Sequence, residues 1–231
     1  MTSAAQVDGP DPPVPAAAGA ATGQTVPTVT RLLAAAAGAF SARGFHATTT
    51  RDIASRAGLS PAGVYVHFAS KEELLHALSR GGHLEALAVV TRAASFEGDA
   101  TDRLAAVMRS FSTWHAEHHE VASVVQYEFP HLTPAHRDDV LALRKQIDAT
   151  VRGVLQEGLD DGTMVVDDVR DTTLALMSLC IDVARWYSPT ISRSAAQIGD
   201  TNAALGLRLV SAQPPSGPSG SRQSAARKSL T

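Results

Sequence analysis

Residues 50–68 have the spacing of a helix-turn-helix, a unit whose second helix can enter the major groove of DNA. Ala54 is small where the two helices would cross closely. Gly58 stands where the turn between them requires a positive φ, which costs glycine little. The two helices would share an apolar seam made by Ile53, Ala57, Leu59 and Val64. The opposite face of the second helix then remains available for a groove about 12 Å wide.

Three histidines close together in the sequence suggest a different chemistry. His115 and His119 stand at i and i+4, a spacing at which two helical side chains can share one metal ion, and His118 lies beside them. No cysteine lies nearby, and the Glu-rich surroundings suit a solvated helix face. Metal sensing is therefore the less favoured interpretation of this cluster.

The sequence carries no recognisable catalytic signature. It holds no nucleophile elbow, no paired carboxylates with a plausible site, no glycine-rich phosphate loop and no His-Glu-x-x-His pattern. Neither an enzyme nor a bound cofactor is predicted. The single cysteine, Cys180, excludes an intrachain disulfide and a Cys-rich zinc module, and it favours a reducing compartment.

Charge is distributed unevenly along the chain. The 231 residues carry 20 Lys and Arg against 23 Asp and Glu, and 44% of them are hydrophobic, which excludes a chain that is disordered throughout. Residues 27–75 hold five bases and three acids, whereas residues 76–210 hold twelve bases and eighteen acids. The modest basic excess therefore falls on the segment with the helix-turn-helix spacing, where a DNA-binding protein needs it.

Apolar residues recur at helical spacing throughout most of residues 27–210, and no alternating strand pattern stands out. This pattern predicts an all-α fold of about nine helices. The first helix would run from about Pro27 to Gly44, before an extended link over 45–49. Ser70 and Glu73 form a capping-box pattern at the start of a long helix. Further helices are expected over 51–57, from Ser60 to Phe68, and over 99–118, 119–129, 134–157, 167–187 and 194–210, with a loop at 158–166.

The two ends of the chain differ from the helical region. Residues 1–26 and about 211–231 are rich in Pro, Gly, Ala and Ser, and we expect both to be flexible tails. The apolar run 172–181 ends after ten residues, too few to span a membrane. The N-terminus has no basic residue before its alanine-rich stretch, so no signal peptide is predicted and a cytoplasmic location is expected.

The helix-turn-helix region carries a family resemblance. The runs Phe45-His-Ala-Thr-Thr-Thr-Arg-Asp-Ile-Ala and Ala57-Gly-Leu-Ser-Pro-Ala-Gly-Val-Tyr-Val-His-Phe-Ala-Ser-Lys-Glu-Glu-Leu-Leu resemble the N-terminal signature of the tetracycline-repressor (TetR) family of bacterial one-component regulators. The Tyr-x-His-Phe-x-x-Lys ending makes this match far more specific than a bare helix-turn-helix. The resemblance implies a DNA-binding domain over 27–75 and a helical effector-binding and dimerisation domain over 76–210.

The resemblance also implies which residues contact DNA. Three groups are expected: the start of the first motif helix, the groove-facing residues of the recognition helix, and side chains that hold phosphates. They are, in that order, Thr49, Thr50 and Arg51; Ser60, Pro61, Ala62, Gly63 and Val66; and Tyr65, His67 and Lys71. The groove-facing side chains are small, and none could make a bidentate base contact. Base recognition would then depend on thymine-methyl contacts, Arg51 and DNA shape.

The helix expected over 167–187 is apolar over a wide arc. One stripe contains Val169, Thr173, Leu176, Cys180, Val183 and Tyr187, and an adjacent stripe contains Leu174, Met177, Ile181 and Ala184. Such a helix is usually buried on two sides, here by its own domain and by a partner chain. Together with Ile198, Leu205 and Leu209 on the helix 194–210, this favours the two-fold four-helix homodimer interface that the resemblance implies. Two recognition helices about 34 Å apart would then match a palindromic operator.

A cavity for a small-molecule effector is expected within 76–210. Its walls and orienting groups would be Phe111, Trp114, Val125, Phe129, Ile147, Met177 and Ile181, with His115, Gln126, Glu128, Arg144 and Arg185. The pattern of Trp, His, Glu and Arg residues from Trp114 to Pro189 looks like a subgroup that includes regulators of lipid and acyl-CoA catabolism. The hypothesis is a repressor released by a small apolar or acyl-CoA-like effector. The alternatives are an aromatic, drug-like or metal effector, or a helical protein-interaction module.

Overall fold

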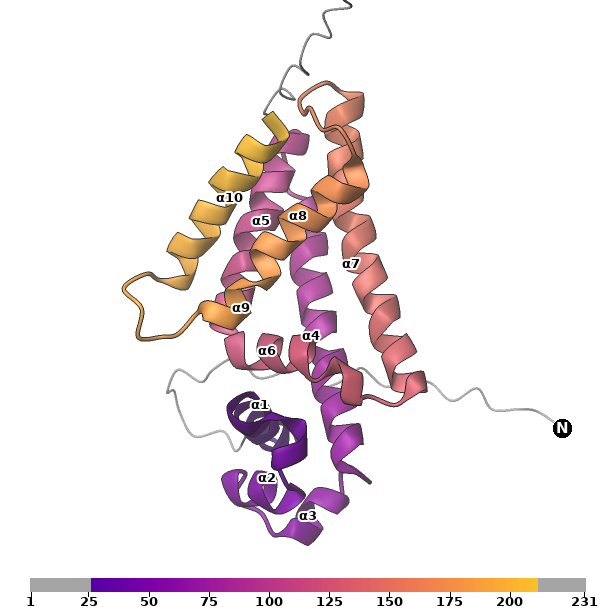
Figure 1. The fold of residues 1–231 in the computed structure, drawn as a ribbon, viewed down its shortest axis with the longest axis vertical. Helices are drawn as coiled ribbons and strands as arrows, with labels where there is room; N and C mark the ends of the chain where they lie inside the picture. The colour runs from indigo at the N-terminus through magenta and orange to yellow at the C-terminus, as the bar shows by residue number, and fades with distance from the viewer. Residues whose placement is uncertain (1–25, 212–231) are drawn as a thin grey trace, which may run out of the picture.

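The computed structural model describes residues 26–211, and this part of the chain is entirely helical (Figure 1). Ten α-helices and one 3₁₀ helix follow one another along residues 26–211, without a strand among them. The predicted all-α fold class is confirmed. The tails expected at 1–26 and 211–231 lie outside the described residues except for Val26 and Ser211. No described helix is both long and apolar enough to cross a membrane.

The first three helices form a small unit at one end of the molecule, which we call the head (residues 28–65; Figure 1). They are α1 (Thr28–Ala47), α2 (Thr50–Arg56) and α3 (Pro61–Tyr65). The head buries Leu32, Phe40, Ile53 and Val64. Ile53 and Val64 belong to the apolar seam that the sequence predicts between the two motif helices. The same core continues into two later helices through Leu74, Leu75, Leu78, Val121 and Val124. The head is therefore packed onto the rest of the protein.

Side-chain caps determine where the short helices of the head begin. The Thr49 hydroxyl accepts from the backbone N–H of Asp52 at 3.1 Å, and the Asp52 carboxylate accepts from the backbone N–H of Thr49 at 2.9 Å. Ser60 caps α3 by accepting from the backbone N–H of Gly63 at 3.2 Å. Gly58, between the two helices, has a φ of 66°, as predicted for the turn.

Two expected details at helix ends are wrong. The first helix does not end at Gly44: this glycine has a φ of 76° and kinks the chain, and α1 continues to Ala47, which shortens the extended link. Ser70 caps α4 (Lys71–Ala94) by accepting from the backbone N–H of Glu73 at 3.0 Å. The Glu73 carboxylate, however, accepts from the backbone N–H of Ala69 at 2.7 Å, so the expected capping box is only half formed.

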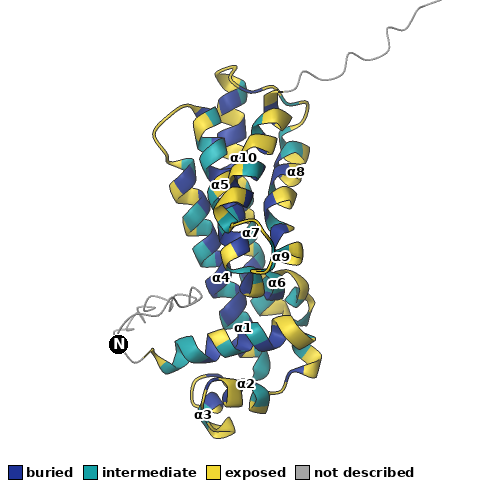
Figure 2. Ribbon diagram, turned by 90° about the vertical axis from the view of Figure 1, so that its left-hand side faces the viewer, coloured by how far each residue is buried: buried dark blue, intermediate teal, exposed yellow. Residues whose placement is uncertain are grey.

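The remaining helices form an elongated bundle with the upper part of α4 (Figure 1). They are α5 (Ala100–Glu117), α6 (His119–Tyr127), the 3₁₀ helix η1 (Phe129–His131), α7 (Pro134–Asp160), α8 (Val169–Ile181), α9 (Val183–Trp186) and α10 (Ala195–Ser211). The helix α4 runs from the head into the bundle, and α6 lies across the lower end of the bundle, next to the head. Buried residues follow the inner faces of these helices (Figure 2).

The helix expected over 167–187 is divided into α8 and α9. The break falls at Asp182, whose carboxylate accepts from Nε and Nη2 of Arg185 at 2.7 and 2.8 Å. The first predicted stripe faces the bundle's own core, where Leu176 and Val183 are fully buried.

Candidate functional site

The tip of the head presents the expected recognition-helix residues to solvent. Val64 is the buried residue of α3. In contrast, the exposed fraction of Val66 is 78% and that of Tyr65 is 54%. Gly63 is half-buried, and the other residues expected at this surface are exposed: Ser60, Pro61, Ala62 and His67. Figure 2 shows this tip as the end of the molecule farthest from the bundle. The structure thus brings the expected residues together on one surface.

A pair of hydroxyl groups joins α2 to α3 at this surface. The Thr50 hydroxyl oxygen and the phenol oxygen of Tyr65 lie 3.1 Å apart, and Arg51 is exposed beside them. The Thr49 hydroxyl donates to the Asp52 carboxylate at 2.7 Å. Hydrogen bonds from Thr49, with the nearby Arg43, lower the pKa of the Asp52 carboxyl. Hydroxyl and guanidinium groups, which can donate hydrogen bonds to phosphates, therefore lie next to the residues that the sequence predicts to face the groove.

Lys71 contacts the protein backbone instead of facing open solvent. Its ammonium group donates to the carbonyl oxygen of Phe45 at 2.7 Å and to that of Thr48 at 2.8 Å, and it lies 4.2 Å from the centroid of the Phe45 ring. Burial lowers the pKa of this ammonium. An ammonium has three N–H donors, so only one remains for a phosphate. In this structure Lys71 ties the start of α4 to the end of α1.

Arg31 holds the turn of the motif, a role that sequence reasoning missed. Its Nε donates to the carbonyl oxygen of Ala57 at 3.2 Å; its Nη2 also donates to Ala57 and lies 3.4 Å from the carbonyl oxygen of Gly58. These carbonyls follow α2, where a cation is electrostatically favoured. No local pattern marks this contact, because Arg31 is separated from Ala57 by 26 positions in the sequence.

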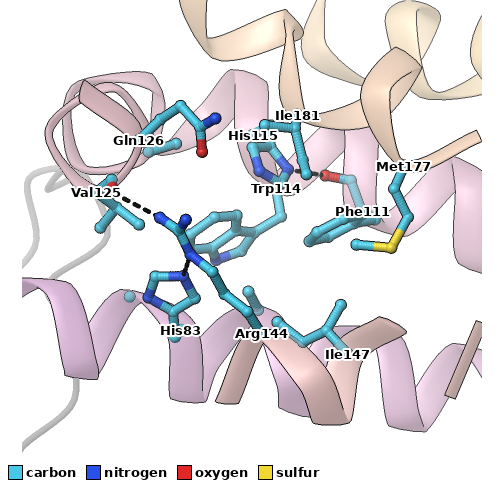
Figure 3. Close-up of a pocket in the computed structure, with 13 residues that line it drawn as sticks. His83, Phe111, Trp114, His115, Val125, Gln126, Arg144, Ile147, Met177 and Ile181 are labelled. Carbon is cyan, nitrogen blue, oxygen red and sulfur yellow. Dashed lines mark hydrogen bonds between the residues drawn. The ribbon is translucent and has the colours of Figure 1, made fainter. Parts of the chain in front are cut away.

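A cavity of about 200 Å³ lies inside the bundle between α4, α5, α6, α7 and α8 (Figure 3). The structure brings together most of the expected effector residues there, namely Phe111, Trp114, His115, Val125, Gln126, Arg144, Ile147, Met177 and Ile181. Sequence reasoning missed four further residues that line the cavity: Gly82, His83, Ala86 and Ala122. The signal for His83 was the pair of glycines before it, since glycines allow another helix to approach closely.

Arg144 and His83 form the polar end of this cavity. Because a carbonyl can only accept, Nδ1 of His83 donates to the carbonyl oxygen of Ser79 at 2.7 Å, which leaves a lone pair on Nε2. Nε of Arg144 donates to that Nε2 at 3.0 Å, and Nη2 of Arg144 donates to the carbonyl oxygen of Val125 at 3.0 Å. Burial lowers the pKa of His83 to about 4, so this ring is neutral at pH 7. The guanidinium of Arg144 keeps its charge.

The other walls of the cavity are apolar or neutral. His115 is buried, and its Nδ1 donates to the carbonyl oxygen of Phe111 at 2.8 Å. Burial lowers the pKa of His115 to about 4. Met177 and Ile147 lie at the opposite end from His83 (Figure 3). The cavity therefore has one polar and one apolar end.

Comparisons with known proteins agree with this architecture. A family model described as "Bacterial regulatory proteins, tetR family" matches residues 32–78, and one described as "Tetracyclin repressor-like, C-terminal domain" matches residues 97–210. The HTH-type transcriptional repressor KstR2 of Mycobacterium tuberculosis is 33% identical over 187 residues, which cover 76% of this chain and 89% of KstR2. The chain belongs to the TetR family. It is a helix-turn-helix, DNA-binding transcriptional regulator of that family.

Solved structures of TetR-family proteins share the fold. The ketosteroid transcriptional regulator KstR2 of Mycobacterium tuberculosis has a TM-score of 0.75 at 28% identity, covering 83% of this chain and 98% of the other. AibR, solved in complex with isovaleryl coenzyme A and operator DNA, has a TM-score of 0.69 at 21% identity, covering 78% and 97%. At that identity, the likeness to AibR shows the fold alone.

Three of the effector residues expected in this TetR-family chain lie outside the cavity. Glu128 follows α6 and lies 3.4 Å from His131. Phe129 packs against the core of the head. The guanidinium carbon of Arg144 lies 4.3 Å from the centroid of the Phe129 ring. Arg185 pairs with Asp182 at the bundle surface. Helical spacing placed these residues near the cavity, but Glu128 and Phe129 follow the end of α6, and Arg185 lies on α9, beyond the end of α8.

The three neighbouring histidines do not converge on a metal site. Within residues 26–211, no group of three or more His, Cys, Asp or Glu side chains could hold a metal ion. Nδ1 of His118 donates to the carbonyl oxygen of Trp114, and Nδ1 of His119 to that of Ala116, each at 3.1 Å. Nδ1 of each of the three histidines therefore bonds a carbonyl of its own helical region.

An apolar face is exposed on α8 and α10, which pack side by side. The exposed fractions are 66% for Leu174, 41% for Leu205 and 44% for Leu209. Ile198, expected on the same surface, is only 1% exposed because it packs with Ala116 and Val183 inside the bundle. Ile198 is therefore a core residue, and Leu205 and Leu209 remain at the surface.

Proposed function

We propose that this TetR-family regulator is a repressor that binds a palindromic operator as a homodimer and leaves it when a small-molecule effector fills the cavity. The position of the cavity carries the proposal. Two of the helices that line it, α4 and α6, also supply core residues to the head. A change at the cavity therefore has a short structural route to the DNA-binding surface.

The helix α6 offers the more direct route. Ala122 and Val125 line the cavity, whereas the neighbouring residues Val121 and Val124 are buried in the core of the head. Closely packed interiors transmit small displacements because they contain few voids. The effector would lower DNA affinity only if it binds the DNA-free arrangement more tightly than the DNA-bound one.

The proposed dimer would form through the exposed faces of α8 and α10. Pairing two copies about a two-fold axis would withdraw Leu174, Leu205 and Leu209 from water in both chains. Each Å² of apolar surface removed contributes about 25 cal/mol. Four helices would meet at this interface, and the two heads would lie on the same side of the dimer.

In the proposed complex, the surface of α3 enters the major groove. The groups that would face base edges are Ser60, Pro61, Ala62, Gly63 and Val66, and those that would approach phosphates are Thr49, Thr50, Arg51, Tyr65, His67 and Lys71. Two of the three Lys71 donors already bind carbonyls, so its share of phosphate binding would be small.

The effector would be small and largely apolar, or it would be the acyl part of an acyl-CoA. An engineered apolar cavity of about 150 Å³ holds benzene, so a cavity of about 200 Å³ suits a ring or branched chain of slightly greater size. The isovaleryl-CoA in the AibR structure supports a short acyl group, whose CoA portion would lie outside this cavity. A regulator of bacterial operons would act in the cytoplasm.

The test is a mobility-shift titration with DNA that flanks the chain's own gene, at moderate salt and with excess unrelated DNA. A discrete complex with two chains on a palindromic footprint supports the proposal, as does its release by a short-chain acyl-CoA or a small apolar compound. The matched control is Val66→Glu. The Val66 side chain is 78% exposed, so a glutamate there should not unfold the head. Its carboxylate would repel the DNA phosphates and should abolish the complex. Failure to form any sequence-specific complex would overturn the proposal.

A further inference from the structure

We infer that the cavity binds a small apolar acid, and that the carboxylate of this acid pairs with the guanidinium of Arg144. The inference rests on the proposed role of the cavity as an effector site and names the chemical class of its ligand. The residues that line the cavity include Arg144 and no Asp, Glu or Lys. The charge pattern of the cavity is therefore that of a receptor for one anionic group.

The guanidinium of Arg144 is surrounded by neutral groups. Its contacts within residues 26–211 are the lone pair of His83, the carbonyl oxygen of Val125 and the ring of Phe129. Burial lowers the pKa of Arg144, and among residues 26–211 no carboxylate hydrogen-bonds to its guanidinium. A cation withdrawn from water without an anionic partner is costly, and a ligand carboxylate would offset that cost.

One edge of this guanidinium remains available to a ligand. Nε and Nη2 have acceptors, whereas Nη1 has none among the described residues and is not among the atoms enclosed without a partner. Figure 3 shows the guanidinium between His83 and Val125, with the amide of Gln126 on the same side of the cavity. A carboxylate could accept from Nη1 and then compete with the carbonyl of Val125 for Nη2, in the paired geometry that arginine favours.

The rest of the cavity would accommodate the apolar part of such an acid. Phe111, Ile147 and Met177, which line the cavity, lie on the side away from His83 and the guanidinium of Arg144 (Figure 3). Compared with the space that benzene needs, the volume suits an acid of about six to ten carbons with a ring or a branch. A neutral thioester in the same place would accept a hydrogen bond but would not neutralise the guanidinium. The structure therefore favours the free acid over its CoA thioester.

Isothermal titration calorimetry on the full chain tests this inference with matched probes. The probes are cyclohexanecarboxylate, 4-methylbenzoate and the branched acid 2-propylpentanoate, each with its neutral amide and its CoA thioester. In the native chain, at least one acid should bind about tenfold to hundredfold more tightly than its amide, since a charge-assisted hydrogen bond contributes that much. Arg144→Gln should abolish this preference, and Arg144→Lys should retain part of it.

The matched control is Arg185→Gln, because Arg185 lies outside the cavity and pairs with Asp182. This variant should keep the preference for the acid. If Arg144→Gln does not fold, the comparison of acid and amide on the native chain decides alone. Equal binding of acids and amides overturns the inference, and so does binding by thioesters alone. Absence of binding by every acid at millimolar concentration also overturns it.

Failure of the inference and failure of the proposed function can be distinguished. If an acid binds through Arg144 but leaves the operator complex intact, the ligand class stands and effector-driven release by that acid fails. If a neutral compound or a thioester releases the operator while no acid binds, the proposed function stands and the inference about Arg144 fails.

Discussion

The ammonium group of Lys71, the first residue of α4, lies 2.8 Å from the carbonyl oxygen of Thr48, just beyond the end of α1. The same ammonium binds the carbonyl oxygen of Phe45. The long helix that runs into the bundle is therefore fastened at its first residue to the helix that supports the DNA-binding motif. A family signature associates this lysine with phosphate, but here its main contacts are within the protein.

Replacing Lys71 with Met should destabilise the head. The change removes two hydrogen bonds from a charged donor and leaves two carbonyls without that partner, so the free energy of unfolding should fall by about 1–3 kcal/mol. Urea unfolding followed by circular dichroism measures this loss, and Lys71→Arg serves as the control that preserves the charge. An unchanged stability, together with a salt slope of operator binding reduced by about one, would instead assign the ammonium to a phosphate.

Removing the Tyr65 hydroxyl should weaken DNA binding while leaving the fold intact. The contact with Thr50 lies on the exposed surface, so Tyr65→Phe should change the free energy of unfolding by less than about 0.5 kcal/mol. Loss of a phosphate contact should weaken binding about fivefold on the operator and on unrelated DNA alike, as measured by fluorescence anisotropy. Val66→Ala is the control and should affect the operator more than unrelated DNA. A loss confined to the operator in Tyr65→Phe would contradict the phosphate role.

Two glycine-to-alanine changes should have opposite effects on stability. A Cβ at Gly199 would lie 2.6 Å from the carbonyl oxygen of Arg109, so Gly199→Ala should push α10 from α5 and cost about 1–3 kcal/mol. A Cβ at Gly153, on α7, would meet nothing within 4 Å, so Gly153→Ala should raise stability by about 0.5–1 kcal/mol. Urea unfolding of both variants is the measurement. Equal effects would mean that α5 and α10 do not approach this closely in solution.

Stability should decline in mildly acidic solution because of two buried histidines. Burial lowers the pKa of His83 and of His115 from 6.5 to about 4. Below pH 6.5 these two histidines bind protons in the unfolded chain but not in the folded chain. The free energy of unfolding therefore falls as the pH drops from 6.5 toward 4. The loss is at most about 3 kcal/mol per histidine.

Thermal unfolding across this pH range measures the decline. His115→Gln should make the pH dependence shallower. The upper half of this window lies above the ordinary pKa of Asp and Glu, so the carboxylates contribute little there. A flat profile in the native chain would show that these rings are not held neutral by burial.

Charges on the exposed face of α10 should separate the proposed dimer. The double change Leu205→Glu and Leu209→Glu would place four carboxylates at a two-fold apolar interface, and the dissociation constant should rise by more than about a hundredfold. Analytical ultracentrifugation measures this shift. Val66→Glu adds the same kind of charge to the head and should leave the dimer intact. A dimer that survives the double change would move the interface away from α8 and α10.

The sequence by itself determined the features that depend on nearby residues. Helical spacing and caps such as Ser60 and Thr49 act within one or two turns, and Gly58 permits a turn that few other residues adopt, so the helix-turn-helix could be predicted from its own residues. The same spacing placed Phe111, Trp114 and Met177 on inward faces, because i, i+3 and i+4 positions share one side of a helix. These patterns sufficed for the fold class and for much of the cavity wall.

Tertiary structure alone decided the contacts between residues far apart in the chain. Arg144 meets His83 across 61 positions, and Lys71 meets Thr48 across 23, and no periodic pattern encodes such pairs. An apolar helix also does not reveal which neighbour covers it, so Ile198 was expected at the surface although it is buried. The physical reason is that burial and electrostatics depend on every element packed around a side chain, and these are set only when the helices come together.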